Sequence, residues 1–133
     1  MTARHTGSCR CGLIGAESTA APFWTSYCHC RDCRRQTGAP VAAFVGFRES
    51  DLSWQGEPSS WRAGGITRSF CRSCGSQIAY RDDRLPGDIY LYLGFMDEPE
   101  AYPPRLHAFE QRRLPFLHIA DDLPRYDGFS IER

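Results

Sequence analysis

Residues 28–33 read CHCRDC and place three cysteines and a histidine within six positions. The chain has seven cysteines, and the other four form two pairs: Cys9 and Cys11 in C-R-C, and Cys71 and Cys74 in C-R-S-C-G. In a reducing compartment such clusters indicate metal binding or catalysis rather than disulfides, and an odd count leaves at least one thiol unpaired. The cysteines are therefore expected to organise both the fold and its chemistry.

Length and charge limit the function classes. With 133 residues, 41% hydrophobic and 13% aromatic, the chain is expected to form one globular domain over residues 1–133. Sixteen basic residues balance sixteen acidic ones, so no broad positive field favours nucleic acid or an anionic membrane. The opening MTARHTGSCRCG lacks the apolar core of a signal peptide, and no segment has the ~18 apolar residues of a membrane span. We expect a cytoplasmic protein.

Short runs of β-branched and aromatic residues alternate with turns rich in glycine and proline. Strands are predicted for PVAAFVGF at 40–47, SQIAYR at 76–81 and DIYLYLGF at 88–95. A single short helix is predicted for RDCRRQTG, which ends at Gly38 as a possible C-cap. The pattern predicts a mainly β fold of short antiparallel strands with little helix.

The two cysteine pairs suit a closed zinc site. Zinc prefers four soft ligands at tetrahedral corners, about 2.3 Å from each sulfur. Cys71 and Cys74 form a C-x-x-C-G turn in which Gly75 supplies an unusual backbone dihedral. Together with Cys9 and Cys11 they would fill all four corners, so a structural zinc is predicted here.

The remaining triplet Cys28, Cys30 and Cys33 supplies only three ligands. A catalytic zinc commonly has three protein ligands and leaves its fourth position to water or substrate. The triplet is therefore a candidate for an open, catalytic zinc site.

Two alternatives to an open zinc site remain for the triplet. A fourth ligand such as His29, His107 or Asp32 would make a second structural zinc, or the thiols would be free. Because neighbouring residues of an extended segment point to opposite sides, we expect His29 to be a surface group or to support a ligand, not to be one.

The cysteine groups and their order resemble the glutathione-dependent formaldehyde-activating enzyme family, which includes centromere protein V and has the Mss4-like fold. The matching stretches are GSCRCG at 7–12, CHCRDCRRQTGAPVAAFVGF at 28–47, TRSFCRSCGSQIAY at 67–80, and a tail from IYLYLGFMDEP through LHAF to DDLPRYDG. The resemblance implies short antiparallel sheets around a zinc-binding core and two zinc ions. One ion would be structural, at Cys9, Cys11, Cys71 and Cys74; the other would be catalytic, at Cys28, Cys30 and Cys33.

The resemblance also implies a carbon–sulfur lyase or synthase reaction, in which the thiol of glutathione or a related thiol adds to formaldehyde or a related aldehyde. The product with formaldehyde is S-(hydroxymethyl)glutathione. Glutathione carries two carboxylates, so Arg34 and Arg35 beside the triplet are candidate substrate-binding residues. His107 is the candidate general acid or base, because an unperturbed histidine titrates near neutrality.

A zinc-stabilised protein-binding module of the same fold is the alternative to an enzyme. An enzyme would hold the second zinc with an open ligand position, whereas a module would fill all four corners with protein. The coordination of the second metal therefore distinguishes the two functions.

Overall fold

The computed structural model describes residues 4–128, and within that range the chain forms ten strands, one α-helix and four short 3-10 helices. The strands are β1 (His5–Ser8), β2 (Gly15–Ser18), β3 (Trp24–Cys28), β4 (Ala42–Arg48), β5 (Leu52–Gln55), β6 (Ser59–Ala63), β7 (Ile66–Phe70), β8 (Gln77–Asp82), β9 (Asp88–Tyr92) and β10 (His107–Ala108). The helix is α1 (Arg31–Thr37), and the 3-10 helices are η1 (Glu49–Asp51), η2 (Leu93–Phe95), η3 (Pro99–Ala101) and η4 (Glu110–Arg112). The prediction of a mainly β chain with little helix is confirmed.

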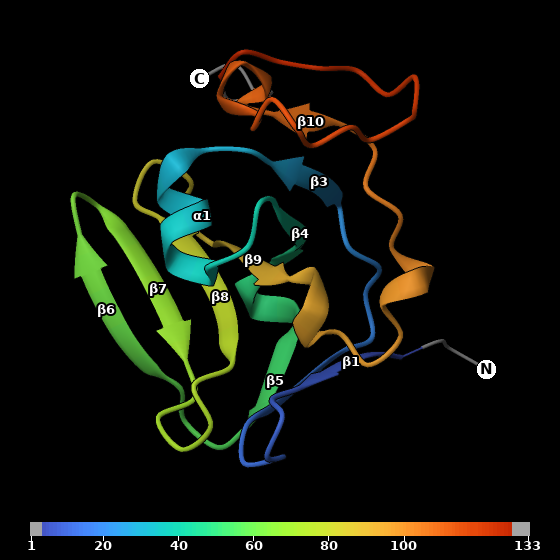
Figure 1. Ribbon diagram of the computed structural model, residues 1–133. Coiled ribbons are helices and arrows are strands. Elements are labelled where there is room, and N and C mark those ends of the chain that lie inside the picture. Colours follow the sequence, from blue (N-terminus) through green and yellow to red (C-terminus); the bar gives the residue numbers. More distant parts are fainter. Residues whose placement is uncertain (1–3, 129–133) are drawn as a thin grey trace.

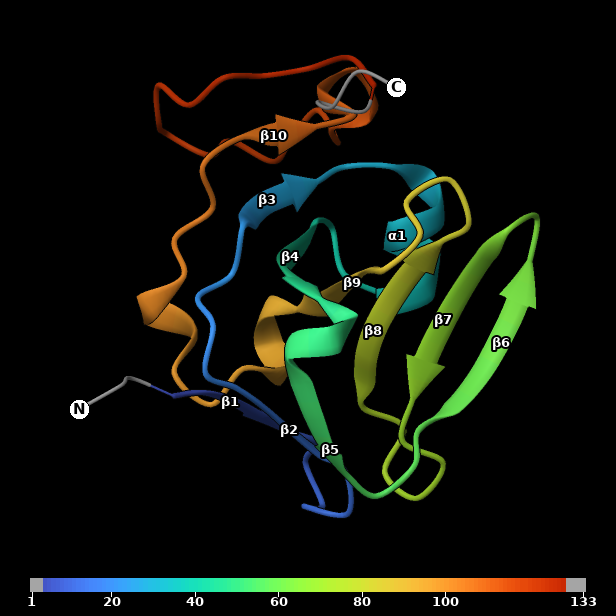
Figure 2. The ribbon, with the colours of Figure 1, turned by 180° about the vertical axis from the view of Figure 1, so that it is seen from behind.

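The strands form two sheets (Figures 1 and 2). Seven strands pair in the order β10-β3-β4-β9-β8-β7-β6, and three pair in the order β1-β2-β5. All neighbours are antiparallel except β10 and β3, which run parallel. The strands predicted near 40–47 and 76–81 are β4 and β8. The one predicted for 88–95 ends at Tyr92, because residues 93–95 turn into η2.

Alternation along the central strands separates two apolar layers. On β4 and β9, Val45 lies opposite Leu91, and both belong to the layer that includes residues of β2 and of the turn before it. One residue along, Phe44 lies opposite Tyr92 in a second layer that also contains the triplet cysteines. Because successive side chains point to opposite faces of a strand, one sheet builds the main core on one side and the triplet surroundings on the other.

Helix α1 begins and ends with identifiable caps. The thiol of Cys30 accepts a hydrogen bond from the backbone N–H of Cys33, 3.2 Å away, as an N-cap side chain does. At the other end Gly38 has φ of 71°, and its N–H donates to the carbonyl of Arg34. The predicted end of the helix is confirmed, and Cys33 lies inside its first turn.

The C-terminal segment lies beside β3, away from β1 (Figures 1 and 2). Strand β10 pairs with the end of β3, so that His107 is level with Tyr27 and Ala108 with Cys28. The backbone N–H of His29 also donates to the carbonyl of Ala108 at 3.0 Å. No helix in residues 4–128 is long and apolar enough to cross a membrane.

Candidate functional site

Four cysteines meet where the β1–β2 turn approaches the β7–β8 turn. The ligand atoms of Cys9, Cys11, Cys71 and Cys74 all lie within 4.8 Å of one another. The sulfurs of Cys9 and Cys11 are 3.7 Å apart, and those of Cys11 and Cys71 are 3.8 Å apart. Sulfurs about 2.3 Å from a tetrahedral zinc lie about 3.8 Å from one another, so this cluster has the spacing of a four-thiolate zinc site.

Hydrogen bonds favour ionisation of Cys9 and Cys74, whereas burial and the neighbouring sulfurs raise the pKa of Cys11 to about 11. The Ser76 hydroxyl lies 3.1 Å from the sulfur of Cys74, and the Ser76 side chain and N–H lower the pKa of Cys74 to about 5. The N–H of Ile14 donates to the sulfur of Cys9 at 3.3 Å. Since thiolates bind zinc and thiols do not, these donors favour the metal-binding form.

The triplet Cys28, Cys30 and Cys33 lies where β3 meets α1. Its three sulfurs also fall within 4.8 Å of one another, with those of Cys28 and Cys33 at 3.5 Å. Among the described residues, no fourth His, Cys, Asp or Glu belongs to this group. The triplet has the spacing of a zinc site that the protein fills at three corners.

The pKa values of the thiols in the triplet are shifted in opposite directions. Hydrogen bonds from Cys28 and Cys33 lower the pKa of Cys30, and the N–H of Cys33 and the charge of Arg68 act in the same direction. Hydrogen bonding to Cys30 and Cys33, together with burial, raises the pKa of Cys28. One thiolate therefore forms readily, whereas a cation is needed to stabilise three.

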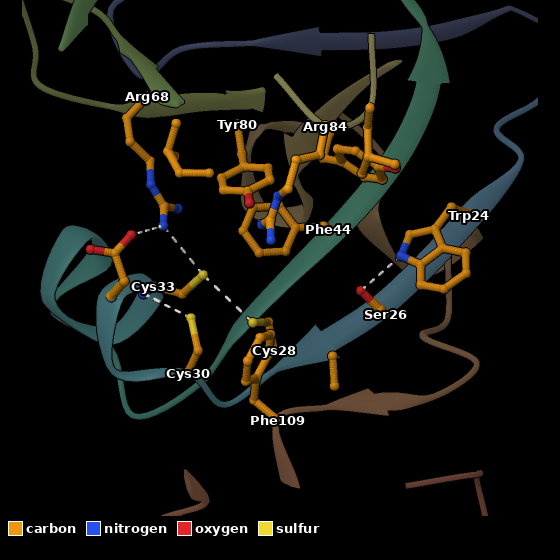
Figure 3. Close-up of a pocket in the computed structure, with 15 residues that line it drawn as sticks. Trp24, Ser26, Cys28, Cys30, Cys33, Phe44, Arg68, Tyr80, Arg84 and Phe109 are labelled. Carbon is orange, nitrogen blue, oxygen red and sulfur yellow. Dashed lines mark hydrogen bonds and ion pairs between the residues drawn. The ribbon is translucent and has the colours of Figure 1, made fainter. Parts of the chain in front are cut away.

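A cavity of about 290 Å³ opens beside the triplet (Figure 3). All three cysteines line it, and the rest of its wall comes from β3, Asp32 of α1, β4, β7, β8, β9, the β8–β9 turn and the residues after His107. The wall includes Trp24, Phe44, Tyr80, Tyr90 and Phe109. The open side of the triplet thus faces space that a small molecule could occupy.

Arg68 is the charged residue most closely associated with the triplet. Its guanidinium donates to the sulfur of Cys33 at 3.5 Å (Figure 3). It also donates to Asp32 and, at 2.7 Å, to the Tyr92 hydroxyl. It also lies 4.7 Å from the centre of the Tyr80 ring. Burial opposes its charge, but Cys33, Tyr92 and Asp32 outweigh burial and raise the pKa of Arg68. This buried cation stabilises negative charge on the sulfurs.

Arg68 was missed by the sequence analysis. Its only local signal is an arginine in the stretch TRSFC, for which no strand was predicted, and an arginine in such a stretch is usually exposed. Here the side chain is 2% exposed because it lies over the Tyr80 ring and contacts Asp32 of α1.

Replacing Arg68 with methionine is expected to weaken zinc binding by the triplet by about 10- to 100-fold, the range seen when a residue that supports a metal ligand is lost. Methionine keeps the length of the side chain but removes the charge next to Cys33. Chelator competition measures the affinity, and Arg62→Met on β6 is the matched control because its ion pair with Asp83 is exposed. Unchanged zinc affinity in Arg68→Met would contradict the charge-stabilising role.

A second group of titratable residues lies behind the triplet. His29 Nε2 and His107 Nδ1 are 2.8 Å apart, and Glu110 Oε2 lies 3.5 Å and 3.8 Å from them. His107 Nε2 is 2.9 Å from a carboxylate oxygen of Asp121, and this interaction lowers the pKa of Asp121. Since Asp121 accepts from Nε2, a neutral His107 accepts at Nδ1 and His29 donates. The hydrogen bonds between Asp121 and His107 and between His107 and His29 therefore anchor the C-terminal segment to residues 28–30.

His29 and His107 are both fully buried, so the expectation that His29 could be a surface group is wrong. Burial lowers the pKa of His29 and keeps it neutral. The direction of its side chain was predicted correctly, because His29 does not line the cavity that the flanking cysteines line. Its contacts support the ligand-bearing turn from behind.

The structure does not bring the other predicted site residues into the cavity. His107 is level with Tyr27, and the two rings stack 4.7 Å apart on the face of β3 opposite Cys28. Arg34 donates to the carbonyls of His29 and Arg112, and Arg35 is exposed. None of the three lines the cavity. Their catalytic and substrate-binding roles stay predictions.

His107→Phe is expected to destabilise the protein by about 2 kcal/mol, because the hydrogen bonds of His107 to His29 and to Asp121 are both lost. Phenylalanine preserves the stacking on Tyr27. Urea unfolding measures the change, and His118→Phe, at an exposed histidine of the same segment, should change stability by less than about 0.5 kcal/mol.

The same variant tests the predicted catalytic role of His107. If His107 transfers protons in the reaction, activity per folded molecule should fall by about 100-fold or more. If it only anchors the turn, activity should follow the folded fraction.

Comparison with known proteins gives one family and one fold. Residues 4–112 match the family described as glutathione-dependent formaldehyde-activating enzyme. The crystal structure of a Rhodobacter sphaeroides protein superposes with a TM-score of 0.58 at 23% identity, covering 69% of this chain and 87% of that one. At that identity the likeness concerns the fold alone. No curated protein matches the chain.

Proposed function

The chain belongs to the glutathione-dependent formaldehyde-activating enzyme family, and from this premise we propose that it is a zinc-dependent carbon–sulfur lyase or synthase. Its reaction would join a glutathione-type thiol to formaldehyde or a related aldehyde, and would also run in reverse. The reacting groups would meet at Cys28, Cys30 and Cys33, in a protein that we expect to be cytoplasmic.

The observation that carries this proposal is the open side of the triplet. Three thiols at zinc-ligand spacing line a cavity, and the described residues supply no fourth ligand. A binding module with two structural zincs would need a fourth protein ligand at the triplet. Asp32, one of the candidates considered, is instead held by Arg68, and His29 and His107 face away from the cavity.

Zinc at the triplet would ionise a substrate thiol or polarise an aldehyde oxygen. Cys28, Cys30 and Cys33 would hold it, and Arg68 would offset the negative charge that three thiolates carry. The cluster of Cys9, Cys11, Cys71 and Cys74 would hold a second, structural zinc between two turns.

The proposed reaction forms one bond and moves one proton. The thiol sulfur bonds to the carbonyl carbon, the electron pair of the C=O bond moves to oxygen, and the proton lost by the thiol is balanced by one gained by that oxygen. The apolar walls of the cavity exclude water from the reacting pair, which strengthens the electrostatic effect of Arg68.

The test combines metal analysis with a kinetic measurement. We expect two zinc ions per chain, of which glutathione changes the coordination of one, and faster exchange between ¹³C-formaldehyde and its glutathione adduct by NMR. Two tightly held zinc ions that are indifferent to thiols, with exchange at the uncatalysed rate, would favour the protein-binding module instead.

A further inference from the structure

We propose that the cavity beside the triplet binds an uncharged aromatic or branched alkyl group of the substrate, next to the reacting sulfur and carbon. The group would be carried by the aldehyde or by the thiol. The inference rests on the proposed function, because it takes the triplet as the place of reaction. It differs from that function in substrate class: formaldehyde has no such group, and glutathione is a charged peptide.

The walls of the cavity are suited to a ring. Aromatic side chains reach it from four different strands and from the segment after β10, and aliphatic side chains reach it from the start of β7 and from the β8–β9 turn. The aromatic residues are Trp24, Phe44, Tyr80, Tyr90 and Phe109, and the aliphatic ones are Ile66 and Leu85. Phe44 and Tyr80 already pack as a tilted aromatic pair with ring centres 5.8 Å apart, and a ring of the substrate could pack against them in the same way.

Each arginine that lines the cavity in the described residues already has a carboxylate partner. Arg68 donates to Asp32, and Arg84 makes an ion pair with Asp82 at 2.6 Å. The Arg84 side chain lowers the pKa of Asp82 to about 2, so Asp82 stays ionised and keeps its partner. The carboxylates of glutathione would therefore compete with carboxylates of the protein for each arginine that lines the described cavity. An uncharged group meets no such competition.

The size of the cavity fits a single ring. Its volume of about 290 Å³ lies at the lower end of ligand sites, which span about 300–1,000 Å³. Formaldehyde would leave most of this apolar space unfilled, and a whole tripeptide would extend out of it. A phenyl or branched alkyl substituent fills the space while its neighbouring sulfur or carbonyl reaches the triplet.

The experiment compares thiols that differ in their apolar group. Cobalt-substituted protein, whose absorption spectrum reports a change of sulfur ligands, is titrated with phenylmethanethiol, 2-mercaptoethanol and glutathione. We expect phenylmethanethiol to bind at least tenfold tighter than the other two, because burial of a phenyl ring contributes at least that factor. Benzaldehyde with 2-mercaptoethanol forms a second arm, in which tenfold tighter binding than formaldehyde with the same thiol places the ring on the aldehyde.

Variants show whether the preference arises in the cavity. Trp24→Ala should reduce the preference for phenylmethanethiol at least fivefold, whereas Trp61→Ala, at a residue 58% exposed on β6 and outside the cavity, should not. Leu85→Arg, at a half-buried position of the cavity wall, is the second variant if Trp24→Ala does not fold. This variant should bind phenylmethanethiol more weakly and glutathione more tightly than the unchanged protein does.

The outcomes separate this inference from the proposed function. Equal affinities for all three thiols, together with no preference for benzaldehyde over formaldehyde, would overturn the proposal that the cavity binds an apolar group. The proposed thiol reaction would be unaffected. If no thiol changes the cobalt spectrum, the proposed reaction is wrong. Calorimetry with benzyl alcohol then tests separately whether the cavity binds an uncharged aromatic group. Binding that Trp24→Ala weakens would support the apolar site, and no binding would overturn it.

Discussion

Replacement of Cys74 by serine is expected to leave no cooperatively folded protein. Zinc in a structural site contributes on the order of 10 kcal/mol of apparent folding free energy. This is as large as the whole stability of a typical domain, about 5–15 kcal/mol. Serine cannot replace a thiolate at zinc, so the variant loses most of that contribution. The expected product lacks a thermal transition in near-ultraviolet circular dichroism and aggregates.

The position of the cluster explains why its effect should spread through the fold. It joins the β1–β2 turn, which belongs to the three-stranded sheet, to the β7–β8 turn of the seven-stranded sheet. Cys9 and Cys71 are also buried in the main apolar layer with Ile14 and Ile78. Loss of the metal would therefore loosen the contact between the two sheets.

A nearby conservative change controls for the turn itself. Ser73 is exposed in the same turn, so Ser73→Ala should melt as the unchanged protein does. Zinc removal from the unchanged protein by a strong chelator should reproduce the effect of Cys74→Ser. If Cys74→Ser instead melted within a few degrees of the unchanged protein, the cluster would not be structural.

The grouping of the cysteines could be predicted because it depends on local geometry. A C-R-C or C-R-S-C-G segment brings its own two sulfurs together in a turn, whatever the rest of the fold does. The strands could be predicted at β4 and β8 for the same reason, since alternation is a property of each run alone. The short helix was recognisable from its end at Gly38.

The residues around the triplet could not be predicted, because their positions depend on strand pairing. His107 lies away from the cavity only because β10 is parallel to β3, with His107 level with Tyr27. A register shift of one residue would turn it toward Cys28. The contact of Arg68 with Cys33 depends on the place of β7 in the sheet, three strands from β4. No local sequence pattern encodes that strand order. Arg34 and Arg35, although adjacent to the triplet in sequence, lie on parts of α1 that do not line the cavity.

Cys30→Ser is expected to do the opposite of Cys74→Ser: the fold remains and the reaction is lost. Serine is among the best N-cap residues, so it can replace Cys30 in accepting the N–H of Cys33 and keep α1 in place. We expect its thermal stability to change by about 1 kcal/mol or less. The second zinc should be lost or weakly held, because only two thiols of the triplet remain.

The expected loss of activity in Cys30→Ser is at least ~100-fold, since a metal that stabilises developing charge contributes several kcal/mol. Cys30→Ala is the companion variant: it removes the same metal ligand but also the cap, so it should lose equal activity and an additional ~1 kcal/mol of stability. Zinc content, melting temperature and formaldehyde exchange are measured on the same preparations. If Cys30→Ser unfolded like Cys74→Ser, the triplet would be a second structural site. Full activity with one zinc would place the reaction elsewhere in the chain. A folded, one-zinc, inactive protein would support the division between a cluster that holds the two sheets together and a triplet that faces its substrate.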